Sequence, residues 1–181
     1  MTETKRRRID QVQDADFLQH LEAMPHDVLR ARRAMCDDLD LEYSYYRRML
    51  HGRMDLLAFE LRRRAGDEEQ TLLEALPRIL AGGAYSSTPG LPSRVVSVEA
   101  PDIPTPGRRL IDRALQSDFL ARLSDFTDDE LLETQRFLME MESEVSIQRR
   151  MVHAAHDRLE TELTRRYREG LADPGESLAR E

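Results

Sequence analysis

The chain has 181 residues, of which 34% are charged and only 6% aromatic, and it contains no tryptophan. This composition favours long amphipathic helices, which bury a stripe of side chains, over a rounded globular core. The formal net charge of −8 argues against direct nucleic-acid binding, because neutralising phosphates requires a basic surface. The single Cys36 cannot form an intramolecular disulfide, and the sequence shows neither a signal peptide nor an apolar run of ~18 residues. We therefore expect a cytoplasmic protein that does not associate with membranes.

The sequence contains the same unit twice, with no insertion in either copy. A shift of 102 residues aligns residues 16–64 with residues 118–166, and 18 of the 49 aligned positions are identical. The identical pairs include Phe17/Phe119, Leu21/Leu123, Arg63/Arg165 and Arg64/Arg166. Agreement of this extent in one ungapped register indicates an internal duplication.

The first third of the chain is predicted to be a tail followed by the first repeat. Residues 1–15, with a basic run at residues 5–8, are assigned to an N-terminal tail. Repeat 1 covers residues 16–66 and consists of a short helix and one long helix. Pro25 marks the start of the long helix, where its missing N–H costs no hydrogen bond, and Gly66 marks its end.

Residues 67–117 are predicted to hold a short helix over residues 68–80 and a flexible linker. The linker, residues 81–107, contains five of the eight prolines and four of the eight glycines. Repeat 2 covers residues 118–170 and again combines a short helix with a long one. Its long helix is predicted to begin at a capping box formed by Thr127 and Glu130 and to end at Gly170. Residues 171–181 are assigned to a C-terminal tail.

An apolar stripe follows each long helix at spacings of three and four residues, which is typical of a helix-packing seam. In repeat 1 the stripe consists of Leu39, Tyr43, Tyr46, Leu50, Met54, Leu57 and Leu61. In repeat 2 it consists of Met141, Val145, Val152, Leu159 and Leu163, interrupted by Gln148 and His156. We expect these stripes to pack the two long helices against each other.

A polar stripe lies beside each seam. Its five residues fall within about 80° of the helix circumference, because each residue advances by ~100°. In repeat 1 the stripe is Asp40, Ser44, Arg47, His51 and Asp55, and in repeat 2 it is Glu142, Ser146, Arg149, His153 and Asp157. A solvated face with ion pairs along one helix is the plain structural explanation. Because both repeats keep the stripe while neighbouring surface positions diverge, we favour a binding role.

The side chains of the stripe match the groups of a guanine nucleotide. An arginine fork can bond guanine O6 and N7 in parallel, and a carboxylate can accept from guanine N1–H and N2–H. Serine, histidine and arginine can all contact phosphate oxygens. The two stripes therefore match two ligand molecules or one ligand with two-fold symmetry.

Two other kinds of site fit the sequence less well. A metal could use the His-x3-Asp pairs of both repeats, but Arg47 and Arg149 lie one turn before each histidine and would oppose a cation. We therefore predict no metal. The sequence has no recognisable nucleophile–base set and no glycine-rich phosphate loop, so we predict a binding protein rather than an enzyme.

The doubled pattern acidic-x3-Ser-x2-Arg-x3-polar-x3-Asp resembles the RsiG family of anti-sigma factors. Members of that family bind cyclic di-GMP through a Glu-x3-Ser-x2-Arg-x3-Gln-x3-Asp motif on each helix of an antiparallel coiled coil. The resemblance covers residues 16–64 and 118–166, and it implies that the matching residues Ser44, Arg47, Asp55, Glu142, Ser146, Arg149 and Asp157 contact the ligand. We expect the remaining stripe residues, Asp40, His51 and His153, to contact it as well. Two features differ from the family pattern: His51 and His153 replace glutamine, and the shorter Asp40 replaces glutamate.

The resemblance implies an all-α fold, an antiparallel two-helix coiled-coil hairpin with short flanking helices. It also implies that two cyclic di-GMP molecules bind, and that the loaded protein sequesters a WhiG-type sigma factor and so represses sporulation genes. A structural coiled coil without a small ligand is the alternative, and the sequence leaves open whether the helix pair forms within one chain.

Overall fold

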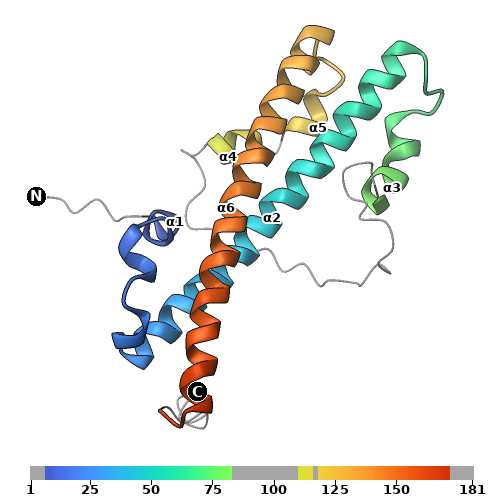
Figure 1. Cartoon of the computed structure of the whole chain (residues 1–181). Helices are drawn as coiled ribbons and strands as arrows, with labels where there is room; N and C mark the ends of the chain where they lie inside the picture. Colours follow the sequence, from blue (N-terminus) through green and yellow to red (C-terminus); the bar gives the residue numbers. More distant parts are fainter. Residues whose placement is uncertain (1–6, 83–109, 116–117, 172–181) are drawn as a thin grey trace, which may run out of the picture. The chain divides into compact units, whose positions relative to one another are not determined.

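The computed structural model describes residues 7–82, 110–115 and 118–171, and every regular element in these ranges is helical. In chain order the helices are α1 (Arg8–Val12), η1 (Ala15–Leu18), η2 (Leu21–Ala23), α2 (His26–Ala65), α3 (Leu72–Gly82), α4 (Leu110–Ala114), α5 (Phe119–Arg122) and α6 (Asp128–Arg168) (Figure 1). This confirms the predicted all-α fold. The predicted linker, apart from its first two residues, and residues 172–181 of the predicted tail lie outside the described ranges. No helix within those ranges combines the length and apolarity needed to cross a membrane.

The chain divides into two compact units, and each contains part of both long helices. Unit 1 comprises Met1–Glu42 and Ile147–Glu181, so it holds the first part of α2 and the second part of α6. Arg33 contacts Glu160 and Asp40 contacts Arg149, so the partner number falls as the residue number rises. The two helices are therefore antiparallel in unit 1.

Unit 2, Tyr43–Ser146, holds the remaining part of α2 and the first part of α6. Arg47 contacts Glu142 and Arg64 contacts Asp128, which is again an antiparallel register. The antiparallel pairing of α2 with α6 within one chain is thus present in each unit, as the resemblance implied.

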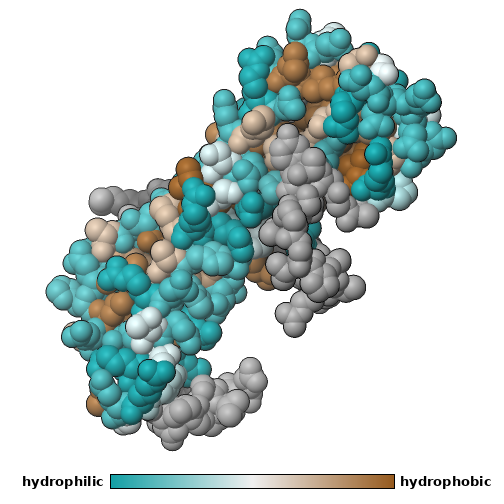
Figure 2. Space-filling model, turned by 45° about the vertical axis from the view of Figure 1, so that its right-hand side comes forward, coloured by the Kyte–Doolittle hydropathy of each residue, from teal (hydrophilic) through white to brown (hydrophobic). Residues whose placement is uncertain are grey.

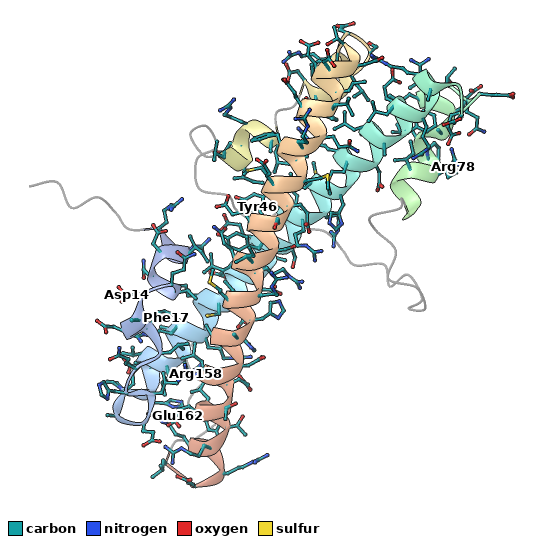
Figure 3. The ribbon with its side chains drawn as sticks, turned by 45° about the horizontal axis from the view of Figure 1, so that its top comes forward. Asp14, Phe17, Tyr46, Arg78, Arg158 and Glu162 are labelled. Carbon is teal, nitrogen blue, oxygen red and sulfur yellow. The ribbon has the colours of Figure 1, made fainter. Side chains whose placement is uncertain are left out.

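The predicted seam forms the core of both units. Leu50, Leu57, Val152 and Leu159 are completely buried, and the other seam positions are buried apart from Leu61, which is half-buried. Tyr46, whose side chain is drawn in Figure 3, also belongs to this core. Burial of each large apolar side chain contributes about 1.5–3 kcal/mol, so the seam is the main source of packing energy. Most of the visible surface is hydrophilic, with hydrophobic patches between (Figure 2).

Turn chemistry sets the ends of the long helices. Gly66, the first residue after α2, and Gly170, the second residue after α6, adopt left-handed conformations with φ of 85° and 69°. Thr127 and Glu130 form the predicted capping box, because the Thr127 amide donates to Glu130 and the Glu130 amide donates to Thr127. A second capping box between Thr71 and Glu74 starts α3 at Leu72, later than the predicted residue 68.

Residues 8–12 are not part of a tail, which corrects the prediction for residues 1–15. They form α1, which buries Ile9 and Val12, while Arg8 donates hydrogen bonds of 3.1 Å to both Asp38 and Glu42 of α2. α4 lies 102 residues later in the chain and has the same length. Ile9/Ile111 and Asp10/Asp112 are identical at this shift, so the duplication begins before residue 16.

In unit 1 an arginine of α6 holds the chain segment that precedes α2. Arg166 donates hydrogen bonds to the backbone carbonyls of Leu21, Glu22 and Met24 at 2.8, 3.2 and 2.8 Å. Its guanidinium is oriented by Glu162, which is buried and accepts a 2.8 Å hydrogen bond from Arg166 Nε. The Leu21 carbonyl also accepts from the Met24 amide, whereas the carbonyls of Glu22 and Met24 have Arg166 as their donor. We call Arg166 and Glu162 a clamp, because they hold this segment at the start of α2.

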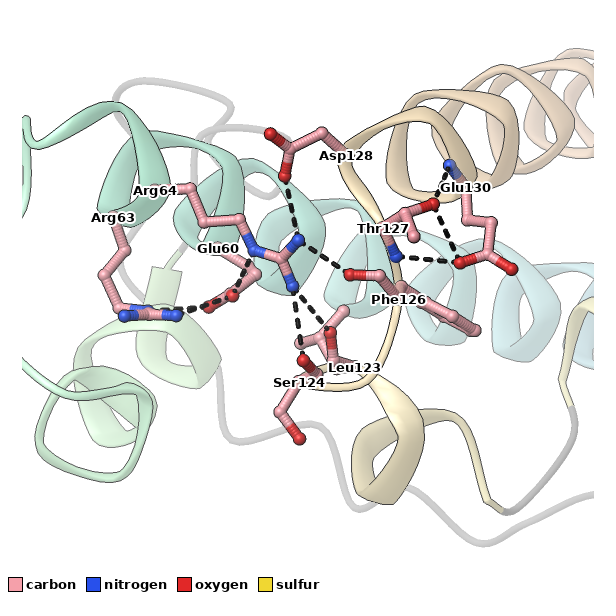
Figure 4. Close-up of polar contacts among 9 residues, drawn as sticks. All are labelled: Glu60, Arg63, Arg64, Leu123, Ser124, Phe126, Thr127, Asp128 and Glu130. Atoms are coloured by element: carbon pink, nitrogen blue, oxygen red, sulfur yellow. Dashed lines mark hydrogen bonds and ion pairs between the residues drawn. The ribbon is translucent and has the colours of Figure 1, made fainter.

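Unit 2 repeats this clamp with the equivalent residues (Figure 4). Arg64 donates to the carbonyl of Phe126 at 2.7 Å, and more weakly to those of Leu123 and Ser124 at 3.5 and 3.4 Å. Glu60 accepts from Arg64 Nε at 2.7 Å. A glutamate and an arginine therefore place the start of the opposite long helix in each unit.

The Glu162 clamp is expected to make the protein sensitive to acid. Hydrogen bonds from Arg165 lower the pKa of the Glu162 carboxyl to about 2, with a further contribution from Arg166 and against the effect of burial. Because the pKa in the unfolded chain is ~4.3, the stabilisation is complete above that value and disappears as the pH falls towards 2. The melting temperature of the wild type should therefore exceed that of Glu162→Gln most at pH 6, and the difference should shrink steadily between pH 5 and pH 2. A constant difference across this range would contradict the assignment.

Candidate functional site

In unit 2, polar-stripe residues from both repeats meet at the carboxylate of Glu142. Its Oε1 lies 2.7 Å from Ser146 Oγ on the same helix, and 3.1 Å from Arg47 Nε and 3.2 Å from His51 Nε2 on α2. Burial raises the pKa of Glu142, but hydrogen bonds from Ser146, Arg47 and His51 lower it by more. Glu142 is therefore a partly buried carboxylate that stays charged at neutral pH. We call these four residues the Glu142 cluster.

In unit 1, the equivalent arrangement forms at Asp40. Asp40 Oδ1 lies 2.9 Å from Arg149 Nε and 2.6 Å from His153 Nε2, both on α6. This Asp40 cluster is more open than the Glu142 cluster, since the His153 side chain is 48% exposed and that of His51 only 18%. The shorter side chain of Asp40 still reaches both partners.

Each cluster takes its carboxylate from one repeat and its arginine and histidine from the other. The antiparallel seam causes this exchange, because it places the first position of one polar stripe opposite the third and fourth positions of the other. The arginines therefore form ion pairs with a carboxylate of the opposite helix, while the stripe carboxylates of their own helix lie seven and eight residues away in sequence. The sequence could not identify these partners, since helical spacing relates only neighbours on one helix.

The other three predicted site residues, Ser44, Asp55 and Asp157, differ in how far they are exposed. Asp157 is exposed, and its carboxylate lies 3.5 Å from His156 Nδ1 on the same helix. Its counterpart Asp55 is buried on α2 in unit 2, and Ser44 is half-buried in the same unit. The fifth position of the stripe is thus exposed in repeat 2 and buried in repeat 1.

A further interhelix pair beside the Asp40 cluster was not predicted. His156 Nε2 lies 3.2 Å from Asp37 Oδ1, and both residues belong to unit 1. At the equivalent positions the other repeat has Met54 and Met139. In the sequence, the one sign of this contact is that His156 interrupts the apolar seam of repeat 2.

The clusters offer groups that a nucleotide could use. Arg47 contacts Glu142 through Nε alone and makes no other hydrogen bond or ion pair to the described residues, so its two Nη groups can donate to a ligand. Beside it, the Ser146 hydroxyl and the His51 imidazole both lie within hydrogen-bond distance of the Glu142 carboxylate. No group of three or more histidine, cysteine, aspartate or glutamate side chains in the described part of the chain is arranged to hold a metal ion.

Comparison with known proteins supports the resemblance over the first repeat. Residues 15–80 match the sequence model of a family described as RsiG-like. The matched segment includes the whole of α2 and most of α3, and it ends before repeat 2. A search of curated proteins finds no match. Residues 15–80, which contribute Asp40, Ser44, Arg47, His51 and Asp55, are therefore an RsiG-like segment, and this suggests an anti-sigma role for the protein.

Proposed function

We propose that this protein is an anti-sigma factor that binds two molecules of cyclic di-GMP through its two polar stripes. In the loaded state it would sequester a WhiG-type sigma factor and so repress the transcription of sporulation genes. The RsiG-like segment supports the anti-sigma role, and the ligand follows from the motif that repeat 1 and repeat 2 share. The proposal describes a binding protein, not an enzyme, and it assigns the protein neither a metal nor direct contact with nucleic acid.

The observation that carries this proposal is the recurrence of one contact pattern in both units. Arg47 and His51 share one oxygen of Glu142, and Arg149 and His153 share one oxygen of Asp40. In each cluster the arginine and the histidine lie within hydrogen-bond distance of a carboxylate oxygen, and the same two side chains could contact the phosphate oxygens of an anionic ligand. The second oxygen of the carboxylate could accept from guanine N1–H and N2–H, so a guanine nucleotide could enter without leaving charges unpaired.

A structural coiled coil is the second candidate, and the same contacts favour it in one respect. The arginine–carboxylate pairs join α2 to α6 directly, as pairs that only align the helices would do. Partly exposed pairs of this kind contribute little stability, about 0–1 kcal/mol each. Their retention in both repeats is therefore better explained by binding than by stability.

Calorimetric titration with cyclic di-GMP should saturate at two ligand molecules per chain. Linear pGpG and GTP should bind far more weakly, because the two-fold pattern of donors matches a cyclic backbone. A thermal-shift scan provides the control for a scaffold: a binder gains about 2.7 kcal/mol at a hundredfold excess over Kd, whereas a scaffold gains nothing. Saturation at one ligand would refute the two-site proposal, and no binding would leave the structural coiled coil.

A further inference from the structure

A third face of the long helices is repeated although neither the seam nor the polar stripe uses it. In α2 it consists of Tyr45, Arg48, Met49 and Gly52, which lie within about 100° of the helix circumference. The equivalent residues of α6 are Ile147, Arg150, Met151 and Ala154. We call each set an Arg-Met face; the first belongs to unit 2 and the second to unit 1.

The Arg-Met pair at the centre of each face is identical in the two repeats and exposed in both. Met49 and Met151 are each 37% exposed, which is unusual for a large apolar side chain kept at the same position twice. Several other exposed positions differ between the repeats: Leu41 corresponds to Ser143, and Ala34 to Arg136. Neither core packing nor the clusters account for the retention of the pair.

The two arginines of these faces have no partner within the described residues. Arg48 and Arg150 are exposed and form no hydrogen bond or ion pair there. Arg47 and Arg149, one position earlier on each helix, both pair with a carboxylate. Each Arg-Met face therefore combines an available positive charge with an apolar side chain.

The small residue one turn beyond the pair leaves room for a neighbour. Gly52 lies inside α2, where glycine costs about 1 kcal/mol relative to alanine, and a Cβ built there would meet no atom within 4 Å. Packing within the chain therefore does not require this glycine. Because a glycine has no side chain, it leaves space on the helix surface beside the exposed methionine. Another helix could therefore approach to the usual interaxial distance of about 8–10 Å.

We infer that each Arg-Met face is a docking surface for an acidic amphipathic helix of the partner protein. The partner's carboxylates would pair with Arg48 or Arg150, and its apolar side chains would cover the methionine and the neighbouring Tyr45 or Ile147. Two faces with the same chemistry fit two such helices. The identity of the partner rests on the proposed function, but the chemistry of the surface does not.

The test uses the full-length chain loaded with cyclic di-GMP and a purified WhiG-type sigma factor. The Arg48→Glu/Arg150→Glu double variant should bind the sigma factor on the order of tenfold or more weakly, with the Kd for cyclic di-GMP unchanged. Arg136→Glu, a charge reversal on α6 outside the faces, should bind like the wild type. Gly52→Ala should raise the melting temperature and keep capture, whereas Gly52→Trp should weaken capture. Undiminished capture by the double variant would overturn the inference.

A second measurement separates failure of this inference from failure of the proposed function. If the wild type does not retain the sigma factor, the proposed partner is wrong. The docking surface is then tested with a different probe, a synthetic helical peptide that carries glutamate and leucine on one face. Binding of that peptide to the wild type, with loss in the double variant, would support the docking surface. Equal binding to both proteins, or to neither, would overturn it.

Discussion

Replacing Arg47 and Arg149 together by alanine is expected to weaken cyclic di-GMP binding by about 2–6 kcal/mol, or roughly 30-fold to 10⁴-fold. Each bidentate arginine contact to a guanine contributes about 1–3 kcal/mol of discrimination, and the two arginines lie in separate clusters. Arg47 has two Nη groups without a partner among the described residues, so it can bond a ligand while it stays on Glu142. Calorimetry on the two single variants and the double variant would measure each contribution.

The stability of these variants provides the control. The Arg47 and Arg149 side chains are 34% and 31% exposed in their ion pairs, so each removal should cost only about 0–1 kcal/mol of folding free energy. Arg48→Ala should leave ligand affinity unchanged, because Arg48 lies outside the polar stripe, about 100° around the helix from Arg47. If affinity survives in the double variant while the melting temperature falls by many degrees, the arginines are structural and the proposed site is wrong.

The second large effect concerns Arg166, whose replacement by alanine is expected to destabilise the protein by about 3–5 kcal/mol. The arginine is buried, and it donates to the backbone carbonyls of Leu21, Glu22 and Met24. Of these, the Leu21 carbonyl also accepts from the Met24 amide. Its loss also removes one of the two cations paired with the buried Glu162. Urea denaturation followed by circular dichroism would give the change in unfolding free energy.

Two other arginine variants show whether a loss of stability comes from the clamp or from removing a positive charge. Arg168→Ala removes an exposed arginine from the end of the same helix and should change stability by less than about 0.5 kcal/mol. Arg64→Ala, the equivalent change in unit 2, should be strongly destabilising as well, and hydrogen exchange should rise first in the unit that carries the substitution. Equal stability of Arg166→Ala and Arg168→Ala would show that the clamp contributes nothing.

The sequence predicted the features that depend on one helix at a time. The spacing of Leu50, Leu57, Val152 and Leu159 defined the seam, because a period of three and four residues places apolar side chains on one face. Gly66 and Gly170 marked the ends of the long helices, since each adopts a left-handed conformation within two residues of the helix end. The antiparallel direction came from the family resemblance, because heptad spacing is the same for both directions.

Features that join distant segments could not be obtained in this way. Arg166 bonds carbonyl groups, which every residue carries, so no residue pattern marks its partners. The short α1 was assigned to a tail because five residues show too little periodicity to stand out beside a basic run. His156 and Asp37 form a pair only because the register of the seam brings them together. Each of these contacts is fixed by packing between helices rather than by local sequence.

The exchange of carboxylates between repeats has a genetic consequence. A duplicated segment ordinarily supplies a spare copy, so one copy can accumulate mutations while the other keeps working. Here Glu142 belongs with Arg47 and His51, and Asp40 belongs with Arg149 and His153. A defective first repeat therefore damages both clusters, as does a defective second one, and the loss of either repeat leaves no cluster complete. The duplication has made the two halves of the gene dependent on each other, and selection must maintain both together.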